Sequence, residues 1–370
     1  MTGKSFDPWL EIDPGALEHN LAAVSRLAGG RPILAVLKNN AYGLGLEVAG
    51  PVLERSARVV GFAVVRAQEA ERLRRAGVRK PILLMGRCGD DEAESLARLG
   101  VRLAALGEDD PTRLGRVARR ARRRVGIHLY VDTGMGLMGF SWRRALPWAR
   151  ALAAEPVLRL EGCFTDLTED PEFDREQTAR LTQLASELRA AGVATGALHA
   201  ASSAGVFGQP ETHLDLVRPG IALYGGYLNK ASMAGDLLRC AIRLRARVVR
   251  VEHLEPGDGV SYHRRWRATQ PTWIAVLPLG HVDGFPSGAV KGAEVLVGER
   301  LYRVIGTVSA SHTVFEVGPE PAVHVGDVAT LVGPDHPAIH PNEIAERSGY
   351  SEYDMFMHLS PLLPRSVPAV

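Results

Sequence analysis

The feature that most constrains this chain is an alternation, from about residue 9 to 235, of short apolar runs with longer stretches in which Leu and Ala recur every third and fourth residue. Short apolar runs are typical of buried strands, and the longer stretches are typical of amphipathic helices. Repeated strand-helix units favour a parallel sheet covered by helices. About eight units can be recognised, so the most economical fold is a TIM (β/α)8 barrel, with a doubly wound sheet as the alternative.

The elements of this barrel can be placed along the chain. The expected strands are 32–37, 59–64, 81–85, 101–105, 126–131, 159–164, 197–200 and 216–223. The clearest expected helices are 67–76, 92–99, 111–123 and 175–191.

The pattern changes after about residue 236, where short β-type segments are separated by glycine turns. These segments are 243–251, 273–277, 294–297, 303–305, 313–317 and 328–332. A chain of 370 residues also exceeds what a single hydrophobic core usually serves. We therefore expect an α/β barrel domain over 9–235 and a smaller, mostly-β domain over 236–370.

Composition excludes several classes of protein. Apolar residues make up 46% and charged residues 23%, which are ordinary globular values. Lys and Arg number 44 against 42 Asp and Glu, so the net charge is only +2. A basic run at 119–124 is too local to set a global field, and we interpret it as a solvated helix face, with no nucleic-acid partner.

The sequence also bears on the cellular compartment and on metal binding. Cys88, Cys163 and Cys240 lie far apart in the sequence, which favours reduced thiols and a cytoplasmic protein. Neither the cysteines nor the histidines have metal-ligand spacing, so we expect no metal. The N-terminus has no apolar signal region, and no run of 18 uncharged apolar residues predicts a membrane partner.

The first candidate for chemistry is Lys38, which directly follows the predicted strand 32–37 and precedes small, turn-forming residues at 39–45. In a barrel, active sites are built at the carboxyl ends of the strands. A lysine that is partly desolvated there can serve as a Schiff-base nucleophile. On this segment alone, a surface lysine in a turn is an equally good interpretation.

Five segments taken together point to a known family. They are 9–13, 35–45, 131–136, 217–225 and the pair 259–262 and 275–286. In this order they resemble the opening strand, the cofactor-lysine motif, the mid-barrel loop, the last barrel strand and the start of the second domain of alanine racemases. The resemblance spans nearly the whole chain, which makes chance or a likeness of fold alone improbable.

The resemblance implies that Lys38 binds pyridoxal 5′-phosphate (PLP) and acts as one of two catalytic bases. Tyr262 matches the other base, although a buried structural tyrosine is the alternative. Racemisation by Cα proton exchange, through an external aldimine, needs a base on each face of Cα. In the family this tyrosine comes from the second protomer, so a head-to-tail homodimer with shared active sites is implied.

The resemblance also implies a cofactor-binding set. Tyr42, Ser203, Gly220 and Ile221 match the residues that hold the phosphate, which is a dianion that needs several donors. Arg218 matches the arginine that faces the pyridine nitrogen of PLP. A guanidinium stays protonated, so it donates a hydrogen bond to that nitrogen without protonating it, and this tends to suppress transamination.

The chain departs from the family pattern at the substrate end. Leu137 stands where the family has an arginine that contacts the substrate carboxylate, and Tyr130 stands where a lysine often braces that arginine. Asp166 replaces a histidine and is expected to pair with Arg218 or to accept a hydrogen bond from Tyr262.

Three further differences affect the pocket. Ala310, within 309–312, replaces a methionine, which predicts a roomier and more polar substrate pocket. Pro361 takes the place of a tyrosine that helps to hold the phosphate. The sequence does not assign roles to His263, His281 and His312.

The leading hypothesis is a PLP-dependent amino-acid racemase that acts on a small amino acid, which need not be alanine. A second hypothesis keeps the fold and the cofactor but changes the reaction to decarboxylation, elimination or aldol-type cleavage, because Leu137 replaces the carboxylate-facing arginine. A third is a PLP-binding protein without turnover, against which Tyr262 counts, since a carrier needs no second base.

Overall fold

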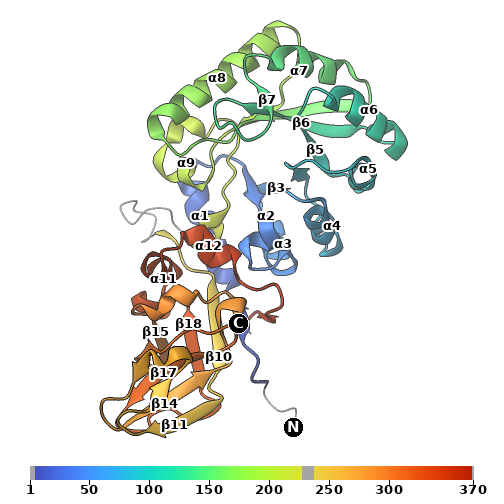
Figure 1. Ribbon diagram of the computed structural model, residues 1–370. Coiled ribbons are helices and arrows are strands. Elements are labelled where there is room, and N and C mark those ends of the chain that lie inside the picture. Colours follow the sequence, from blue (N-terminus) through green and yellow to red (C-terminus); the bar gives the residue numbers. More distant parts are fainter. Residues whose placement is uncertain (1–4, 227–236, 369–370) are drawn as a thin grey trace.

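The computed structural model describes residues 5–226 and 237–368, and its first part is a parallel barrel wrapped by helices (Figure 1). The hydrogen-bonded strand order is β2-β3-β4-β5-β6-β8-β9, and all neighbours on this path are parallel. The strands are β2 (Ile33–Val36), β3 (Val59–Val64), β4 (Ile82–Leu84), β5 (Arg102–Ala105), β6 (Val125–Asp132), β7 (Phe140–Ser141), β8 (Leu158–Phe164) and β9 (Ala197–His199). The helices around them are α1 (Pro14–Leu27), α3 (Leu46–Glu54), α4 (Ala67–Arg75), α5 (Asp90–Arg98), α6 (Asp110–Ala121), α7 (Ala145–Ala154), α8 (Pro171–Ala190) and α9 (Ser203–Gly208).

The ring is closed by residues 215–219, which lie between the first and last strands. The backbone N–H of Leu34 donates to the carbonyl of Val217 at 2.9 Å, and that of Arg218 donates to Ala201 at 2.8 Å. The expected strand 216–223 is reduced to an isolated bridge between Val217 and Ile33, and its second half is wrong, because Ile221–Tyr224 form a 3-10 helix. Gly220, at φ −121° and ψ −90°, breaks the extended backbone there.

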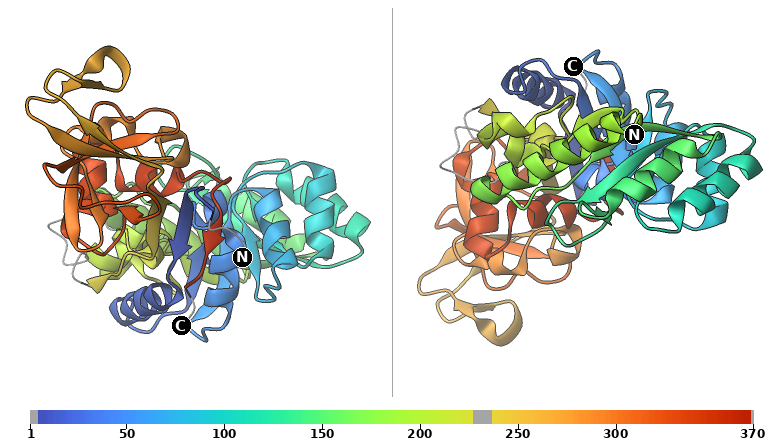
Figure 2. Two further views of the ribbon diagram at one scale, coloured as in Figure 1. Left: turned by 90° about the horizontal axis from the view of Figure 1, so that it is seen from below. Right: turned by 90° about the horizontal axis from the view of Figure 1, so that it is seen from above.

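The second part is a mostly antiparallel sheet, in which β1 and β19 are a parallel pair. It lies below the barrel in Figure 1, and Figure 2 shows it from two further directions. Its strand order is β11-β14-β17-β16-β15-β18-β10-β1-β19. The strands are β1 (Trp9–Ile12), β10 (Ile242–Arg247), β11 (Arg250–Leu254), β14 (Thr272–Leu277), β15 (Glu294–Val297), β16 (Arg300–Ile305), β17 (Thr313–Gly318), β18 (Val328–Val332) and β19 (Arg365–Ser366). Short β12 (Gly259–Val260) and β13 (Trp266–Arg267) form a separate hairpin.

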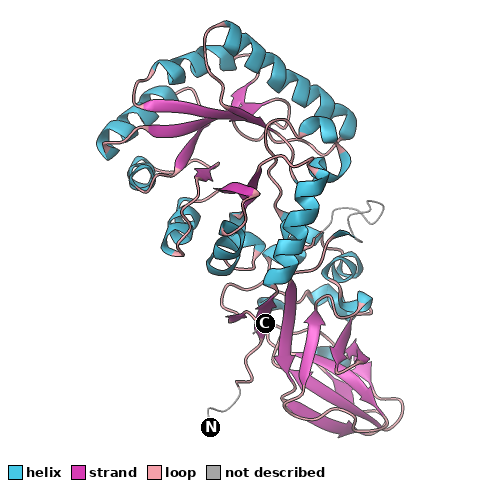
Figure 3. Ribbon diagram, turned by 180° about the vertical axis from the view of Figure 1, so that it is seen from behind, coloured by secondary structure: helices cyan, strands magenta, loops and turns pink. Residues whose placement is uncertain are grey.

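The first strand of the chain belongs to this second sheet, since β1 pairs with β10 and β19. Residues from the start of the chain therefore tie the two domains together, and apolar side chains from both domains share one continuous core. The expected division between 235 and 236 lies outside the described residues. Figure 3 shows the helices outside the barrel strands and the β-rich second domain beside them.

Two short helices near the C-terminus, α11 (Pro341–Ser348) and α12 (Glu352–Met357), pack between the domains. At the N-terminus of α11, the side chain of His340 accepts a hydrogen bond from the backbone N–H of Asn342. Gly43 makes close packing of α12 possible: its φ is +87°, and a Cβ there would lie 2.1 Å from the carbonyl oxygen of Phe356. This contact brings α12 against the mouth of the barrel.

No helix in the described ranges combines the length and the apolar character needed to span a bilayer.

Candidate active site

Lys38 lies at the carboxyl end of β2, where the backbone turns sharply. The next four residues, at positions 39–42, have φ between 53° and 59°, so segment α2 (Lys38–Tyr42) turns in the left-handed sense. Such a conformation is costly for residues other than glycine, and here side chains hold it in place. Asn40 accepts a hydrogen bond from Arg72 at 2.7 Å, and its backbone N–H donates to Glu69 at 3.1 Å. The strained turn fixes the direction in which Lys38 leaves the strand.

The predicted phosphate-binding residues converge beside this lysine. The Lys38 Nζ atom is 6.0 Å from the centre of the Tyr42 ring. The Ser203 hydroxyl accepts hydrogen bonds from the backbone N–H groups of Gly220 at 3.0 Å and Ala222 at 3.2 Å, which leaves its own proton free to be donated. A Cβ on Gly220 would lie 2.1 Å from the Tyr42 hydroxyl, so only glycine leaves room for that hydroxyl.

The groups that surround this cradle keep its hydroxyls protonated, so that they can donate hydrogen bonds. Burial, together with the nearby Tyr353, Asp166 and Glu169, raises the pKa of Tyr42, so its hydroxyl keeps its proton. Ile221 begins the 3-10 helix that follows Gly220, and its backbone N–H has no hydrogen-bond acceptor among the described residues. Two hydroxyls and backbone amides suit a phosphate dianion.

Arg218, two residues before Gly220, is buried, and its guanidinium makes four hydrogen bonds. Nη1 donates to the carbonyl of His199 at 2.8 Å and to its ring Nδ1 at 3.0 Å. Nη2 donates to the carbonyl of Thr165 at 2.7 Å and to the carboxylate of Asp166 at 2.6 Å. The Nε–H group is the one donor without an acceptor in the described part of the chain, which suits a ring nitrogen.

Asp166 and Tyr130, two of the positions that depart from the family pattern, contact each other. Besides pairing with Arg218, Asp166 accepts a hydrogen bond from the Tyr130 hydroxyl at 2.5 Å. The expected pair with Arg218 is therefore present, and the tyrosine that donates to Asp166 within this chain is Tyr130 and not Tyr262. Burial raises the pKa of Tyr130, so this phenol remains a donor. Tyr130 also packs on Phe164, with ring centres 4.3 Å apart.

Behind Arg218 lies a pair of buried histidines that the sequence did not reveal. The Nδ1 atom of His128 is 2.9 Å from the Nε2 atom of His199. Because Arg218 can only donate, we assign His199 as an acceptor at Nδ1 and a donor at Nε2. Burial lowers the pKa of His128 to about 3 and places that of His199 well below its usual value. Both rings are therefore neutral and fix the position of the guanidinium.

This pair predicts a pH-dependent stability. Both folded-state pKa values lie below the ordinary 6.5, so the stabilisation is complete above pH 6.5 and is lost as the unfolded chain takes up protons below it. His128→Gln should flatten the pH dependence of the unfolding free energy by about 1.4 kcal/mol per pH unit between pH 6 and 4. Urea unfolding across this range measures it, with the exposed His324→Gln as control. An unchanged slope in His128→Gln would contradict the assignment.

Two further residues lie at the site although the sequence analysis did not predict them. Tyr353, on α12, lies against Tyr42 with ring centres 6.2 Å apart, so a second tyrosine reaches the phosphate end although position 361 is proline. Glu169 has a φ of +64°, and burial together with Asp174 raises its pKa, whereas the charge of Lys38 acts in the opposite direction. The capping box at Ser351, which starts α12, was the one local signal for Tyr353.

The other predicted residues do not meet Lys38 within one chain. The side chains of Leu137 and Tyr262 are 67% and 69% exposed, and Ala310 is also exposed. No contact among the described residues joins any of them to the Lys38 cradle. The turn that carries Tyr262 is strained, with φ near +60° at Ser261 and His263. His263, His281 and His312 are exposed as well.

Comparisons with known proteins agree with this arrangement. Residues 12–228 match the family described as alanine racemase, N-terminal domain, and residues 241–367 match alanine racemase, C-terminal domain. The alanine racemase of Desulforamulus reducens is 34% identical over 365 residues, covering 96% of this chain and 98% of that protein. The alanine racemase of Symbiobacterium thermophilum is also 34% identical, with 96% of each chain covered.

Solved structures give the same result. The crystal structure of alanine racemase from Streptomyces lavendulae has a TM-score of 0.91 and 26% identity, covering 100% of this chain and 98% of that chain. The structure of the Bacillus anthracis enzyme with bound L-Ala-P has a TM-score of 0.87 and 27% identity, covering 100% and 96%. The predicted fold class, a barrel followed by a mostly-β domain, is confirmed. The chain belongs to the alanine racemase family.

Proposed function

We propose that this chain is a PLP-dependent amino-acid racemase in which Lys38 and the partner subunit's Tyr262 exchange the Cα proton on opposite faces of the substrate. The family is known to use PLP. The observation that carries the proposal is the convergence, at one end of the barrel, of Lys38, the Tyr42–Ser203–Gly220 cradle and the free Nε–H donor of Arg218.

The residues present fit the cofactor. Lys38 would hold its aldehyde carbon, Tyr42, Ser203, Gly220 and Ile221 would hold its phosphate, and the Arg218 Nε–H would face its ring nitrogen. When bound, PLP supplies an electron sink that stabilises negative charge at Cα.

The protein groups then move and hold protons. The Lys38 amine takes or returns the Cα proton on one face, and the phenol of the partner subunit's Tyr262 does so on the other. Arg218 only donates a hydrogen bond, because a guanidinium does not release its proton. Asp166 and the two neutral histidines behind it keep the guanidinium in place.

The exposure of Tyr262 in a single chain supports a shared active site. A base that is 69% exposed on a strained turn cannot work in open water, since catalysis needs a positioned and desolvated group. We infer a head-to-tail homodimer in which the mostly-β domain of one chain completes the active site in the barrel of its partner. The free thiols of Cys88, Cys163 and Cys240 favour a reducing, cytoplasmic compartment.

The substrate is an amino acid whose side chain can be larger or more polar than that of alanine. Apolar Leu137 offers no charge to a carboxylate, and Ala310 leaves space. Single enantiomers of several amino acids, incubated with the holoenzyme in deuterated water, should gain deuterium at Cα and lose optical purity. If none of these amino acids gained deuterium at Cα, a racemase would be excluded. A product whose mass differs from that of the substrate by more than the deuterium gained at Cα would instead support the second candidate, which is decarboxylation, elimination or aldol-type cleavage and is favoured by the apolar Leu137.

Asp166→Asn should weaken PLP retention by roughly 10- to 100-fold. The substitution removes one charged hydrogen bond from Arg218, worth about 1.5–3 kcal/mol, and loosens the group that faces the ring nitrogen. Absorbance titration of the apoenzyme with PLP measures the loss. Glu176→Gln, which removes an exposed carboxylate from α8, is the charge control. Retention equal to that of the wild type would show that Asp166 does not position Arg218.

A further inference from the structure

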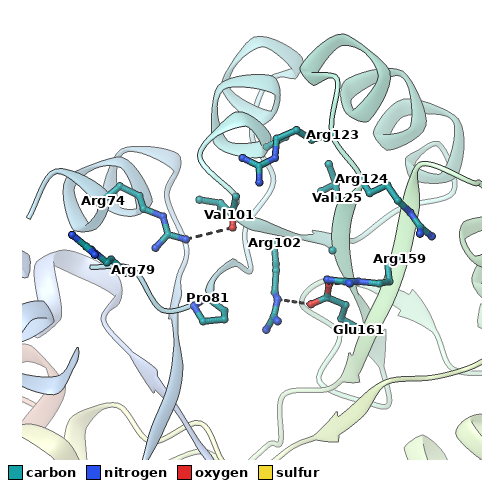
Figure 4. A pocket seen from close by; sticks show the side chains of 13 residues that line it. Arg74, Arg79, Pro81, Val101, Arg102, Arg123, Arg124, Val125, Arg159 and Glu161 are labelled. Atoms are coloured by element: carbon teal, nitrogen blue, oxygen red, sulfur yellow. Dashed lines mark hydrogen bonds and ion pairs between the residues drawn. The ribbon is translucent and has the colours of Figure 1, made fainter. Parts of the chain in front are cut away.

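A cavity of about 240 Å³ opens at the amino-terminal ends of the barrel strands, on the face opposite Lys38 (Figure 4). Six arginines line it, and they come from α4, β5, β8 and the loops that precede β4 and β6. They are Arg74, Arg79, Arg102, Arg123, Arg124 and Arg159. The one carboxylate in the lining is that of Glu161. This end of a barrel usually serves stability, so such a concentration of one charge needs its own explanation.

The strand register builds the centre of the cavity. Neighbouring strands β5, β6 and β8 place Arg102, Gly126 and Arg159 in one row. Gly126 leaves the row open, since a Cβ there would lie 2.6 Å from the Glu161 carboxylate. Glu161 therefore reaches across β6 to Arg102, with Nε and Oε2 2.5 Å apart, and also pairs with Arg159. One carboxylate thus serves two guanidinium groups.

Two of the other arginines have a structural role. Arg74 donates to the carbonyls of Val78 at 2.9 Å and Leu99 at 3.1 Å, and Arg123 donates to that of Arg98 at 2.8 Å. These carbonyls lie at or beyond helix C-termini, where a cation is stabilising. Arg79 and Arg124 differ, because within the described ranges their guanidinium groups bond to no other residue, and both side chains are exposed.

The arginines of the basic run at 119–124 therefore lie in two different environments. Arg119 and Arg120 pair with Glu155 and Asp91 on the surface of α6 and its neighbours, as expected of a solvated helix face. Arg123 and Arg124 are exposed as well, but they lie beyond the end of α6 and line the cavity. Glu54, beside the cavity, accepts hydrogen bonds from the backbone N–H groups of Arg79 and Lys80 at 3.1 Å. Glu54 and Glu161 together offset only part of the charge of the six arginines.

We propose that this cavity binds a small anion that carries two or more phosphoryl groups. Arg102 and Arg159 share a single carboxylate at the centre of the cavity, and Arg79 and Arg124 add positive charge at its two opposite edges, as Figure 4 shows. An anion with several phosphoryl groups would meet more of this charge than a single phosphate could. The volume of about 240 Å³ is far above the roughly 10–15 Å³ that one water molecule needs on the same measure, so there is room for more than one phosphate. Binding would relieve repulsion among like charges and stabilise the folded chain.

Calorimetric titration of the PLP-loaded enzyme with pyrophosphate, tripolyphosphate and ADP tests this site, because PLP keeps the probes out of the active-site cradle. We expect binding of the two inorganic probes, and at least about tenfold weaker binding by the double variant Arg79→Gln/Arg124→Gln. Tighter binding of ADP than of pyrophosphate would identify a nucleotide as the natural source, and the reverse an inorganic one.

The control is Arg150→Gln/Arg303→Gln, which removes the same charge from exposed positions on α7 and β16 and should bind like the wild type. Racemase activity should be unchanged in both double variants. Equal binding by all three proteins, or binding no stronger than that of sulfate at the same ionic strength, would overturn the proposal.

Discussion

Lys38→Ala is expected to abolish racemisation and to leave no borohydride-stable adduct of PLP with the chain. The loss should exceed the roughly 10²- to 10⁴-fold effect of removing one acid-base group, because the same amine also anchors the cofactor. The phosphate cradle stays intact in this variant, since Tyr42, Ser203 and Gly220 contact one another without Lys38. PLP should therefore still bind, but reversibly.

The measurement combines activity with the mass of the reduced protein. Borohydride treatment of the wild-type holoenzyme should add the mass of reduced PLP to the peptide that contains Lys38. Lys291→Ala, at an exposed lysine of the second domain, is the matched control and should keep both activity and adduct. A covalent adduct on any other lysine of active protein would contradict the assignment of Lys38.

Local motifs allowed the sequence to name residues that the structure brings together at the mouth of the barrel. Lys38, Tyr42 and Gly220 could be placed because each lies in a segment whose own backbone shapes the site, as in the left-handed turn after β2 and the break at 220. The apolar runs at β2 and β4 are buried along their whole length, which is why they could be recognised as inner strands.

Residues whose roles depend on long-range packing could not be predicted in the same way. Tyr130 and Asp166 appeared as separate departures, and only the β6–β8 register, which pairs Tyr130 with Phe164, brings them together. Tyr353 reaches Tyr42 because Gly43 lets α12 approach, a contact between residues some 300 positions apart in the chain. Likewise β1 precedes the barrel in sequence but pairs with the second sheet, since strand pairing does not follow chain order.

Tyr262→Phe should reduce racemisation by about 10²- to 10⁴-fold while leaving half of the proton chemistry in place. Lys38 remains, so one enantiomer should still exchange its Cα proton with deuterated water, whereas the mirror-image substrate should not. Substrate NMR with each enantiomer separates the two faces. Loss of exchange for both enantiomers, or normal racemisation, would show that Tyr262 is not the second base.

Mixing the two inactive variants tests whether the active site is shared. If each site takes Lys38 from one chain and Tyr262 from the other, a mixed dimer of Lys38→Ala and Tyr262→Phe has one site that lacks both groups and one that lacks neither. Random exchange of subunits in an equal mixture should then restore about a quarter of wild-type activity, because about half of the dimers are mixed and each contains one intact site. The Tyr262 side chain, 69% exposed in the single chain, makes this outcome the expected one. If the mixture stays inactive after subunit exchange has been demonstrated, the two bases belong to the same chain, and the second domain has to move toward its own barrel for catalysis.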